Sequence, residues 1–176
     1  MSPFFREARK PYMVYVVMGV SGCGKTTIGR LLAERLHLPF FEGDDYHSST
    51  NVAKMRSSRP LTDFDRHAWL ETLAQKIDEW QNTGGAVLAC SALKGRYRKT
   101  LISYNKHVRF VYLKGDKRRI GERMAKRTDH YMPVTLLDSQ FQTLEEPADA
   151  IVASIDQTPQ AICDFIITEL SAGGDR

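Results

Sequence analysis

Residues 19–26 read GVSGCGKT, and this stretch decides the fold of the chain. The segment before it, residues 12–18, is apolar and rich in β-branched side chains, which is typical of a buried parallel strand. The segment after it, residues 27–36, repeats apolar side chains at the spacing of a helix. A strand, a glycine loop and a helix in this order predict a phosphate-binding loop of the form G-x-x-x-x-G-K-[ST].

The residue types of this loop suit a bound triphosphate. Its glycines permit backbone conformations in which successive amides line a concave nest, and the helix that begins near Lys25 adds its positive N-terminal end. Lys25 can reach the β- and γ-phosphates, and the Thr26 hydroxyl can ligate Mg²⁺. The alternative is a glycine-rich turn before an ordinary helix, but a chance match to the full pattern is rare at average composition. The predicted nucleotide-binding residues are Gly19, Val20, Ser21, Gly22, Cys23, Gly24, Lys25, Thr26 and Thr27.

The composition of the whole chain is that of a soluble globular protein, with 42% hydrophobic and 26% charged residues. We expect a single domain over residues 1–176, with residues 1–11 as a flexible tail. No apolar run approaches membrane-spanning length, and the basic N-terminus lacks the apolar core of a signal peptide, which favours a cytoplasmic protein without a membrane partner. Cys23, Cys90 and Cys163 are widely spaced and are predicted to be free thiols.

The net charge of +4 is unevenly distributed. Residues 94–127 hold more than half of the 25 Lys and Arg side chains, opposed only by Asp116 and Glu122. A basic stretch can bind nucleic acid, but no aromatic interleaving or known nucleic-acid module accompanies it. An anionic small substrate together with a triphosphate explains it as well, and part of it is expected to be solvated helix surface.

The rest of the chain alternates between strand and helix patterns. Further strands are expected at residues 38–41, 86–90, 108–113 and 151–155. Helices are expected at residues 93–104, 116–127, from 134 onward and 159–170, whereas residues 47–55 could be a helix or a loop. Thr62 and Asp65 have the spacing of a capping box, so another helix is expected to start there. This order predicts an α/β fold, a five-stranded parallel sheet with helices on both faces.

Short motifs beyond the loop resemble those of the bacterial-type gluconokinases, P-loop kinases related to shikimate kinase. They keep the order of that family: GDDYH at 43–47, NVAKM at 51–55, PLTDFDR at 60–66, CSALK at 90–94, HYMP at 130–133 and LDSQFQTLEEP at 137–147. The resemblance implies the P-loop kinase fold, a mobile lid near residues 121–142 and commonly a homodimer. It also implies phosphorylation of D-gluconate at its 6-hydroxyl by ATP with Mg²⁺, giving 6-phosphogluconate and ADP.

The chain departs from this family pattern at several positions without losing Lys25 or Asp44. Where the family usually has Ser, Asp, Pro, an acidic residue and Lys-Gly, this chain has Cys23, Glu42, Ser48, Phe64 and Thr128-Asp129. Glu42 still supplies a carboxylate, and it is a predicted magnesium contact through a water molecule.

Asp44 is predicted to accept the proton of the substrate hydroxyl. Phosphoryl transfer depends mainly on positioning and charge stabilisation, with a carboxylate to orient the attacking hydroxyl. Asp44 follows the second predicted strand, at the edge where parallel sheets bind their ligands. The alternative is that Asp44 and Asp45 only cap the next turn. We interpret Asp44 as catalytic and leave Asp45 open.

Several side chains after Asp44 are candidates for binding the sugar acid. His47 and Asn51 are predicted polyol contacts because they belong to the family motifs, and Lys54 lies beside them. Alone, each would be ordinary surface. Arg66 is a candidate for the substrate carboxylate, since a guanidinium binds a carboxylate with two hydrogen bonds. His130, in the lid motif, is a further predicted substrate contact.

Arg123 and Arg127 are predicted to be catalytic. Their i, i+4 spacing places them on one face of a helix, directly before the expected lid. They could close on the β- and γ-phosphates in the manner of an arginine finger. The alternative is a solvated basic helix end that interacts favourably with the helix dipole.

Cys23 is expected to be the most reactive thiol of the chain. It lies near a helix N-terminus and near Lys25, and both favour the thiolate. Burial against the sheet would act in the opposite direction. Our hypothesis is that the loop environment dominates, so that Cys23 is alkylated before Cys90 and Cys163.

Two other functions stay open on the sequence alone. A kinase of the same fold could act on shikimate, a nucleotide or another sugar acid, and a substrate panel would separate these. A nucleotide-dependent switch or an RNA-binding protein could use the basic stretch and would bind nucleic acid in a salt-dependent way. The acidic residues at the predicted strand ends favour a small-molecule kinase without a nucleic-acid partner, because they would repel a polyanion.

Overall fold

The frame of the molecule is a parallel five-stranded sheet, in a computed structural model that describes residues 11–104, 107–126 and 134–173. The strand order is β2-β3-β1-β4-β5. The strands are β1 (Val14–Met18), β2 (Phe40–Glu42), β3 (Ala86–Ala89), β4 (Val108–Lys114) and β5 (Ala150–Ser154). The predicted sheet is therefore confirmed. Residues 1–10 of the expected tail, and Arg127, Thr128, Asp129 and His130 of the expected lid, lie outside the described residues.

Seven helices and a short 3₁₀ turn, η1 (Gly43–Tyr46), connect and cover these strands in the described part of the chain. The helices are α1 (Lys25–Leu36), α2 (Ser49–Arg56), α3 (Asp63–Thr83), α4 (Gly95–Leu101), α5 (Lys117–Ala125), α6 (Val134–Thr143) and α7 (Pro159–Ala172). The capping box of Thr62 and Asp65 is present at the start of α3. Helix α4 is shorter than the expected 93–104 at both ends: it begins at Gly95, where the Leu93 carbonyl accepts the Glu145 amide instead of a helical one, and it ends at Leu101.

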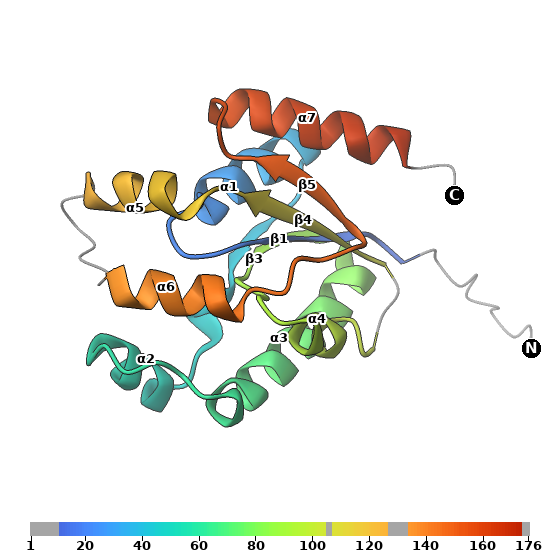
Figure 1. The fold of residues 1–176 in the computed structure, drawn as a ribbon. Coiled ribbons are helices and arrows are strands. Elements are labelled where there is room, and N and C mark those ends of the chain that lie inside the picture. The colour runs from blue at the N-terminus through green and yellow to red at the C-terminus, as the bar shows by residue number, and fades with distance from the viewer. Residues whose placement is uncertain (1–10, 105–106, 127–133, 174–176) are drawn as a thin grey trace, which may run out of the picture.

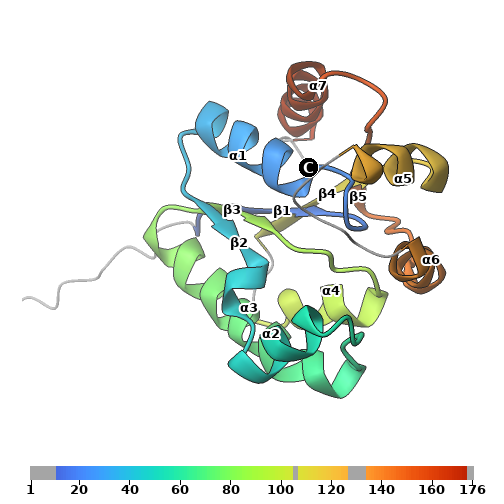
Figure 2. The ribbon, with the colours of Figure 1, turned by 90° about the vertical axis from the view of Figure 1, so that its left-hand side faces the viewer.

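Two hydrophobic cores form because alternate side chains of β1 point to opposite faces of the sheet. Figure 2 shows α1 and α7 above the sheet, and α3 and α4 below it. On the first face Val17 joins Leu32 of α1 and Ile166 of α7. On the second face Val16 joins Leu73 of α3 and Leu101 of α4. Each of these six side chains is at most 1% exposed, so the predicted layers on both faces are confirmed.

The carboxyl ends of the strands form the edge at which chemistry-bearing residues gather. Figure 1 shows α2, α5 and α6 grouped at this edge. The phosphate loop leaves β1 here, and η1 leaves β2. Two glycines allow close packing at this edge. A Cβ on Gly22 (φ 81°) would lie 2.5 Å from Met124 of α5, and one on Gly43 would lie 2.6 Å from the Ala89 carbonyl oxygen.

Candidate active site

A pocket of about 470 Å³ lies at this edge of the sheet. Its phosphate end, as we use the term, comprises Ser21, Lys25 and Glu42. Its acceptor end comprises His47, Arg59, Arg66, Lys94 and Tyr97. Asp44 also lines the pocket, two residues after Glu42 and 3.8 Å from His47, and so lies between the two ends. The fold thus brings the predicted Lys25, Glu42, Asp44, His47 and Arg66 to one cavity.

The start of α1 is arranged to bind an anion. Gly24 is its N-cap in a left-handed conformation (φ 104°), and no side chain of the described residues caps the helix. The amides of its first turn therefore have no side-chain acceptor, which is the arrangement that favours a bound phosphate. The Lys25 ammonium donates to the Val20 carbonyl oxygen (3.1 Å), so it lies folded over the loop.

Thr26 and Glu42 meet beside the phosphate loop. The Thr26 hydroxyl donates to Glu42 Oε2 at 2.7 Å. Burial is the main reason that the pKa of Glu42 is raised, and Asp44 adds to this, whereas the bond from Thr26 opposes it. Mg²⁺ prefers a few oxygen ligands together with phosphates and water, so this hydroxyl and carboxylate fit it. The described residues contain no cluster of three or more His, Cys, Asp or Glu side chains that could hold a metal ion alone.

Asp44 and His47 form the centre of the pocket. The Asp44 side chain is 75% exposed, whereas that of His47 is only 2% exposed and stacks on Trp69 with ring centres 4.2 Å apart. Trp69 in turn donates from Nε1 to the Gly43 carbonyl oxygen (2.8 Å), which fixes η1. Burial lowers the pKa of His47 and keeps the ring neutral near pH 7. An open carboxylate therefore stands next to a rigid, neutral hydrogen-bonding ring.

Asn51 and Lys54 brace α2 against α3, and neither lines the pocket. The Asn51 amide donates to the Asp65 carbonyl oxygen (2.8 Å) and lies 3.4 Å from His47 Nδ1. The Lys54 ammonium donates to the Asp65 carboxylate (2.6 Å), and this bond is the main reason that the pKa of Asp65 falls to about 2. Asn51 therefore reaches the pocket through His47, and a direct contact with substrate stays a prediction.

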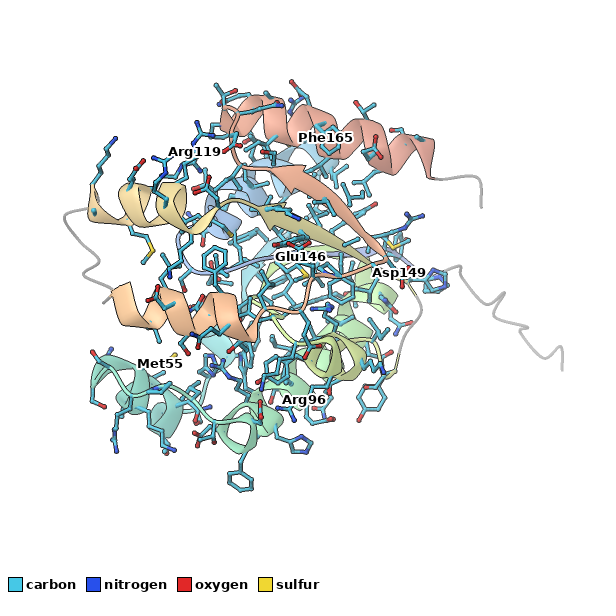
Figure 3. All side chains as sticks on the ribbon, viewed as in Figure 1. Met55, Arg96, Arg119, Glu146, Asp149 and Phe165 are labelled. Carbon is cyan, nitrogen blue, oxygen red and sulfur yellow. The ribbon has the colours of Figure 1, made fainter. Side chains whose placement is uncertain are left out.

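Asp63 organises the acceptor end, and the sequence did not reveal it. Its carboxylate accepts from Tyr97, from Arg96 and from Lys94 (3.0 Å). These bonds, that of Tyr97 first, hold the pKa of Asp63 well below its usual range. Figure 3 labels Arg96, which lies below α6 in that view. An acidic residue in the first turn of a helix is ordinary, so the spacing of Asp63 gave no signal.

Arg66 is a cation of the acceptor end that lies beside the ring of Tyr97. Its guanidinium carbon lies 5.9 Å from the ring centre of Tyr97. It makes no ion pair with any other described residue, unlike Lys94, which is held by Asp63. Because a cation held over an aromatic ring keeps its donors for a ligand, Arg66 is placed to receive an anionic group.

Arg123 lies close to the phosphate loop but outside the pocket lining. Its Nη2 donates to the Ile155 carbonyl oxygen at 2.5 Å, at the end of β5. To reach a bound phosphate, the side chain has to leave this carbonyl. Arg127, its expected partner, lies outside the described residues.

The hypothesis that the loop environment dominates the pKa of Cys23 is wrong, whereas the order in which the three thiols are alkylated stays a prediction. Its side chain is 1% exposed beneath the loop, and burial raises the pKa of the thiol more than Lys25 lowers it. Cys90 is also buried, which raises its pKa to about 12, and Cys163 is fully buried. All three are free cysteines, as predicted.

Helix α6 forms a further wall of the pocket, and the sequence assigned it no residue role. Gln140 exchanges two hydrogen bonds with Ser21 of the phosphate loop. Glu145, just after α6, accepts from the Gly95 amide at 2.7 Å. Both belong to the motif at residues 137–147, so a pattern was visible there, but the contacts link segments far apart in the sequence.

The chain is similar to proteins of known kinase families. A family model described as shikimate kinase matches residues 21–171. The thermoresistant gluconokinase of Escherichia coli (strain K12) is 38% identical over 91% of this chain and 94% of its own length. A gluconokinase of Gluconobacter oxydans (strain 621H) is 42% identical over 89% and 90%, respectively.

A solved structure agrees with these sequence matches. The crystal structure of a gluconokinase from Sinorhizobium meliloti 1021 superposes with a TM-score of 0.84 at 37% identity, covering 93% of this chain and 94% of that one. Identity at this level extends over almost the whole of both chains, so the match includes the pocket as well as the sheet. The chain therefore belongs to the gluconokinase family, within the wider group that the shikimate kinase model describes.

Proposed function

We propose that this protein transfers the γ-phosphoryl group of ATP to the 6-hydroxyl of D-gluconate, giving 6-phosphogluconate and ADP. One observation carries the proposal: a single pocket joins Lys25 of the phosphate loop, the open carboxylate of Asp44 and the guanidinium of Arg66, which forms no ion pair with any other described residue. D-gluconate has a carboxylate at one end for a cation and a primary hydroxyl at the other end for a base. The family relationship supports the same reaction.

In this proposal the phosphate end binds and neutralises ATP. Residues 19–27 wrap around the phosphates, with Gln140 accepting from the Ser21 amide while other amides of the loop bind phosphate oxygens, and Lys25 leaves the Val20 carbonyl to meet the β- and γ-phosphates. Thr26 would ligate Mg²⁺ directly and Glu42 through a water, and the ion would supply positive charge to the phosphate oxygens. Arg123, with Arg127, would add charge at the γ-phosphate after leaving the Ile155 carbonyl.

The acceptor end orients the sugar acid. Asp44 accepts the proton of the 6-hydroxyl as it attacks phosphorus, and the neutral ring of His47 hydrogen-bonds the polyol. Asn51 holds His47, since its amide lies 3.4 Å from His47 Nδ1. Arg66 binds the substrate carboxylate, with His130 as a further contact when the segment near residues 121–142 closes over the ligands.

We also propose a homodimer of single-domain subunits in the cytoplasm, without a nucleic-acid or membrane partner. No helix in the described ranges is long and apolar enough to cross a membrane. Sedimentation equilibrium tests the dimer, and a single species of monomer mass would contradict it.

A substrate panel tests the function. ADP release is measured with ATP and Mg²⁺ on D-gluconate, L-idonate, shikimate and without acceptor. We expect turnover with D-gluconate to exceed all other arms. A higher rate with shikimate or L-idonate would replace the proposed acceptor, and equal rates in all arms would exclude a small-molecule kinase of this class.

A further inference from the structure

Helix α6 contacts the phosphate loop through the side chain of Gln140. The Ser21 amide donates to Gln140 Oε1 at 2.6 Å, and Gln140 Nε2 donates to Ser21 Oγ at 2.9 Å. Both residues line the pocket, although they are 119 positions apart in the sequence. A carboxamide suits this pair because one planar group supplies both an acceptor and a donor.

One face of α6 forms a wall of the pocket along most of the helix. The residues of this face follow i, i+3, i+4, i+7 spacing: Leu136, Ser139, Gln140 and Thr143. Leu137, on another face, is only 3% exposed and packs into the core with Ile120 of α5. The helix is therefore anchored behind the pocket while its Gln140 holds the phosphate loop in front.

The chain after α6 is tied to the acceptor end. The Glu145 amide donates to the Leu93 carbonyl oxygen (2.8 Å), and the Glu145 carboxylate accepts from the Gly95 amide (2.7 Å). Leu93, which accepts one of these bonds, and Lys94, which lies between the two bonded residues, line the pocket. Gln140 and Glu145 thus connect the phosphate end and the acceptor end through five residues of chain.

We propose that Gln140 is a positioning residue that preorganises the phosphate loop and, through α6, couples nucleotide binding to acceptor binding. Holding Ser21 in place before ATP arrives lowers the ordering cost of binding. Because α6 borders both ends, a ligand that stabilises its docked position at one end favours binding at the other, and this coupling is reciprocal. The proposal rests on the proposed function only in taking D-gluconate as the acceptor.

The first test needs nucleotide alone. Gln140→Leu removes both hydrogen bonds, and Gln142→Leu makes the same replacement at an exposed position of the same helix. Calorimetric titration with a non-hydrolysable ATP analogue should show affinity reduced about tenfold in Gln140→Leu, as expected for two lost neutral hydrogen bonds. Gln142→Leu should match the wild type. Unchanged or tighter binding by Gln140→Leu would overturn the docking role.

A double-mutant cycle separates this role from a general loss of stability. Ser21→Ala removes the hydroxyl that Gln140 donates to and leaves the amide in place. In the Gln140→Leu background, Ser21→Ala should weaken nucleotide binding much less than it does in the wild type. Fully additive losses would show that the two side chains act independently, against the proposal. The cycle stays informative if Gln140→Leu melts at a lower temperature, because only the difference between backgrounds is compared.

The second test repeats the titrations with saturating D-gluconate. In the wild type, D-gluconate should tighten binding of the ATP analogue. The ratio of the analogue's affinity with D-gluconate to its affinity without D-gluconate measures the coupling. This ratio should fall towards one in Gln140→Leu and stay at the wild-type value in Gln142→Leu. An unchanged ratio in Gln140→Leu, or a ratio of one in the wild type, would overturn the coupling. If the wild type does not bind D-gluconate, the proposed function fails, while the nucleotide tests still decide the docking role.

Discussion

The two ends of the pocket are built in different ways. The phosphate end relies on the backbone of consecutive residues 19–26 and on the first turn of α1. The acceptor end relies on side chains from the end of η1, from α3 and from α4, such as the η1 C-cap His47, Arg66 and Tyr97, which only the fold brings together. A site that binds through backbone amides is expected to keep its affinity when a side chain changes, as at Cys23. A site that binds through side chains loses a contact with each side chain that is replaced.

The largest effect is expected at Asp44, where the two ends meet. Asp44→Asn should lower kcat about 100- to 10,000-fold, the contribution typical of a general base, while the affinity for ATP stays close to wild type. Steady-state kinetics and nucleotide titration measure the two quantities. Asp45→Asn, the same change at the exposed neighbouring residue, is the control. If Asp44→Asn keeps most of the wild-type kcat, the catalytic assignment is wrong.

Lys25→Ala should act on the phosphate end. Loss of its ammonium removes charge stabilisation from the transferred group and should lower kcat about 1000-fold, within the range for one preorganised donor. Unlike Asp44→Asn, it should also weaken nucleotide binding. Lys99→Ala, at an exposed position of α4, controls for loss of positive charge. Equal nucleotide affinity in Lys25→Ala and wild type would contradict the assignment.

Arg66→Leu should affect only the acceptor end. Removing a charge-assisted pair of hydrogen bonds to the carboxylate should raise KM for D-gluconate about 10- to 100-fold, with KM for ATP unchanged. Arg56→Leu, on the exposed end of α2, is the matched control. A rise in the KM of both substrates would indicate that Arg66 holds the fold of the pocket instead of the carboxylate.

The smallest effect is expected at Cys23. Because the thiol is 1% exposed and its pKa is raised by burial, iodoacetamide should modify it slowly in the folded protein. Cys23→Ser should keep kcat within about twofold of wild type, since the loop binds through amides that this change preserves. Mass spectrometry with and without denaturant checks the labelling. Rapid labelling of Cys23 before unfolding would restore the hypothesis that the structure rejects.

The same contrast explains what the sequence could predict. The strand, the phosphate loop and α1 are contiguous, so their pattern placed β1, Lys25 and Thr26 correctly. The helices and strands after them were also predicted, because each carries its own periodicity and caps, such as Thr62 at α3. The burial of the Cys23 side chain was not predicted. Its spacing places Cys23 near Lys25 but does not show that the side chain points under the loop.

The acceptor end was predicted only in part. Family motifs drew attention to His47 and Arg66, which do line the pocket. Asp63 and Gln140 were missed because their roles depend on partners 31 or more residues away in sequence, Lys94 and Ser21. Local spacing carries no information about such contacts. Asn51 was predicted as a polyol contact from a family motif, and that contact stays a prediction; its bond to the Asp65 carbonyl of α3 could not be read from the sequence.

The position of the phosphate on the product tests the central claim most directly. ATP, Mg²⁺ and D-gluconate are incubated with the wild-type protein and with Asp44→Asn, and the products are examined by phosphorus NMR. We predict one new phosphate ester, coupled to the methylene protons of carbon 6, formed by the wild type and almost absent with Asp44→Asn. An ester at another hydroxyl, or no product that depends on D-gluconate, would contradict the account.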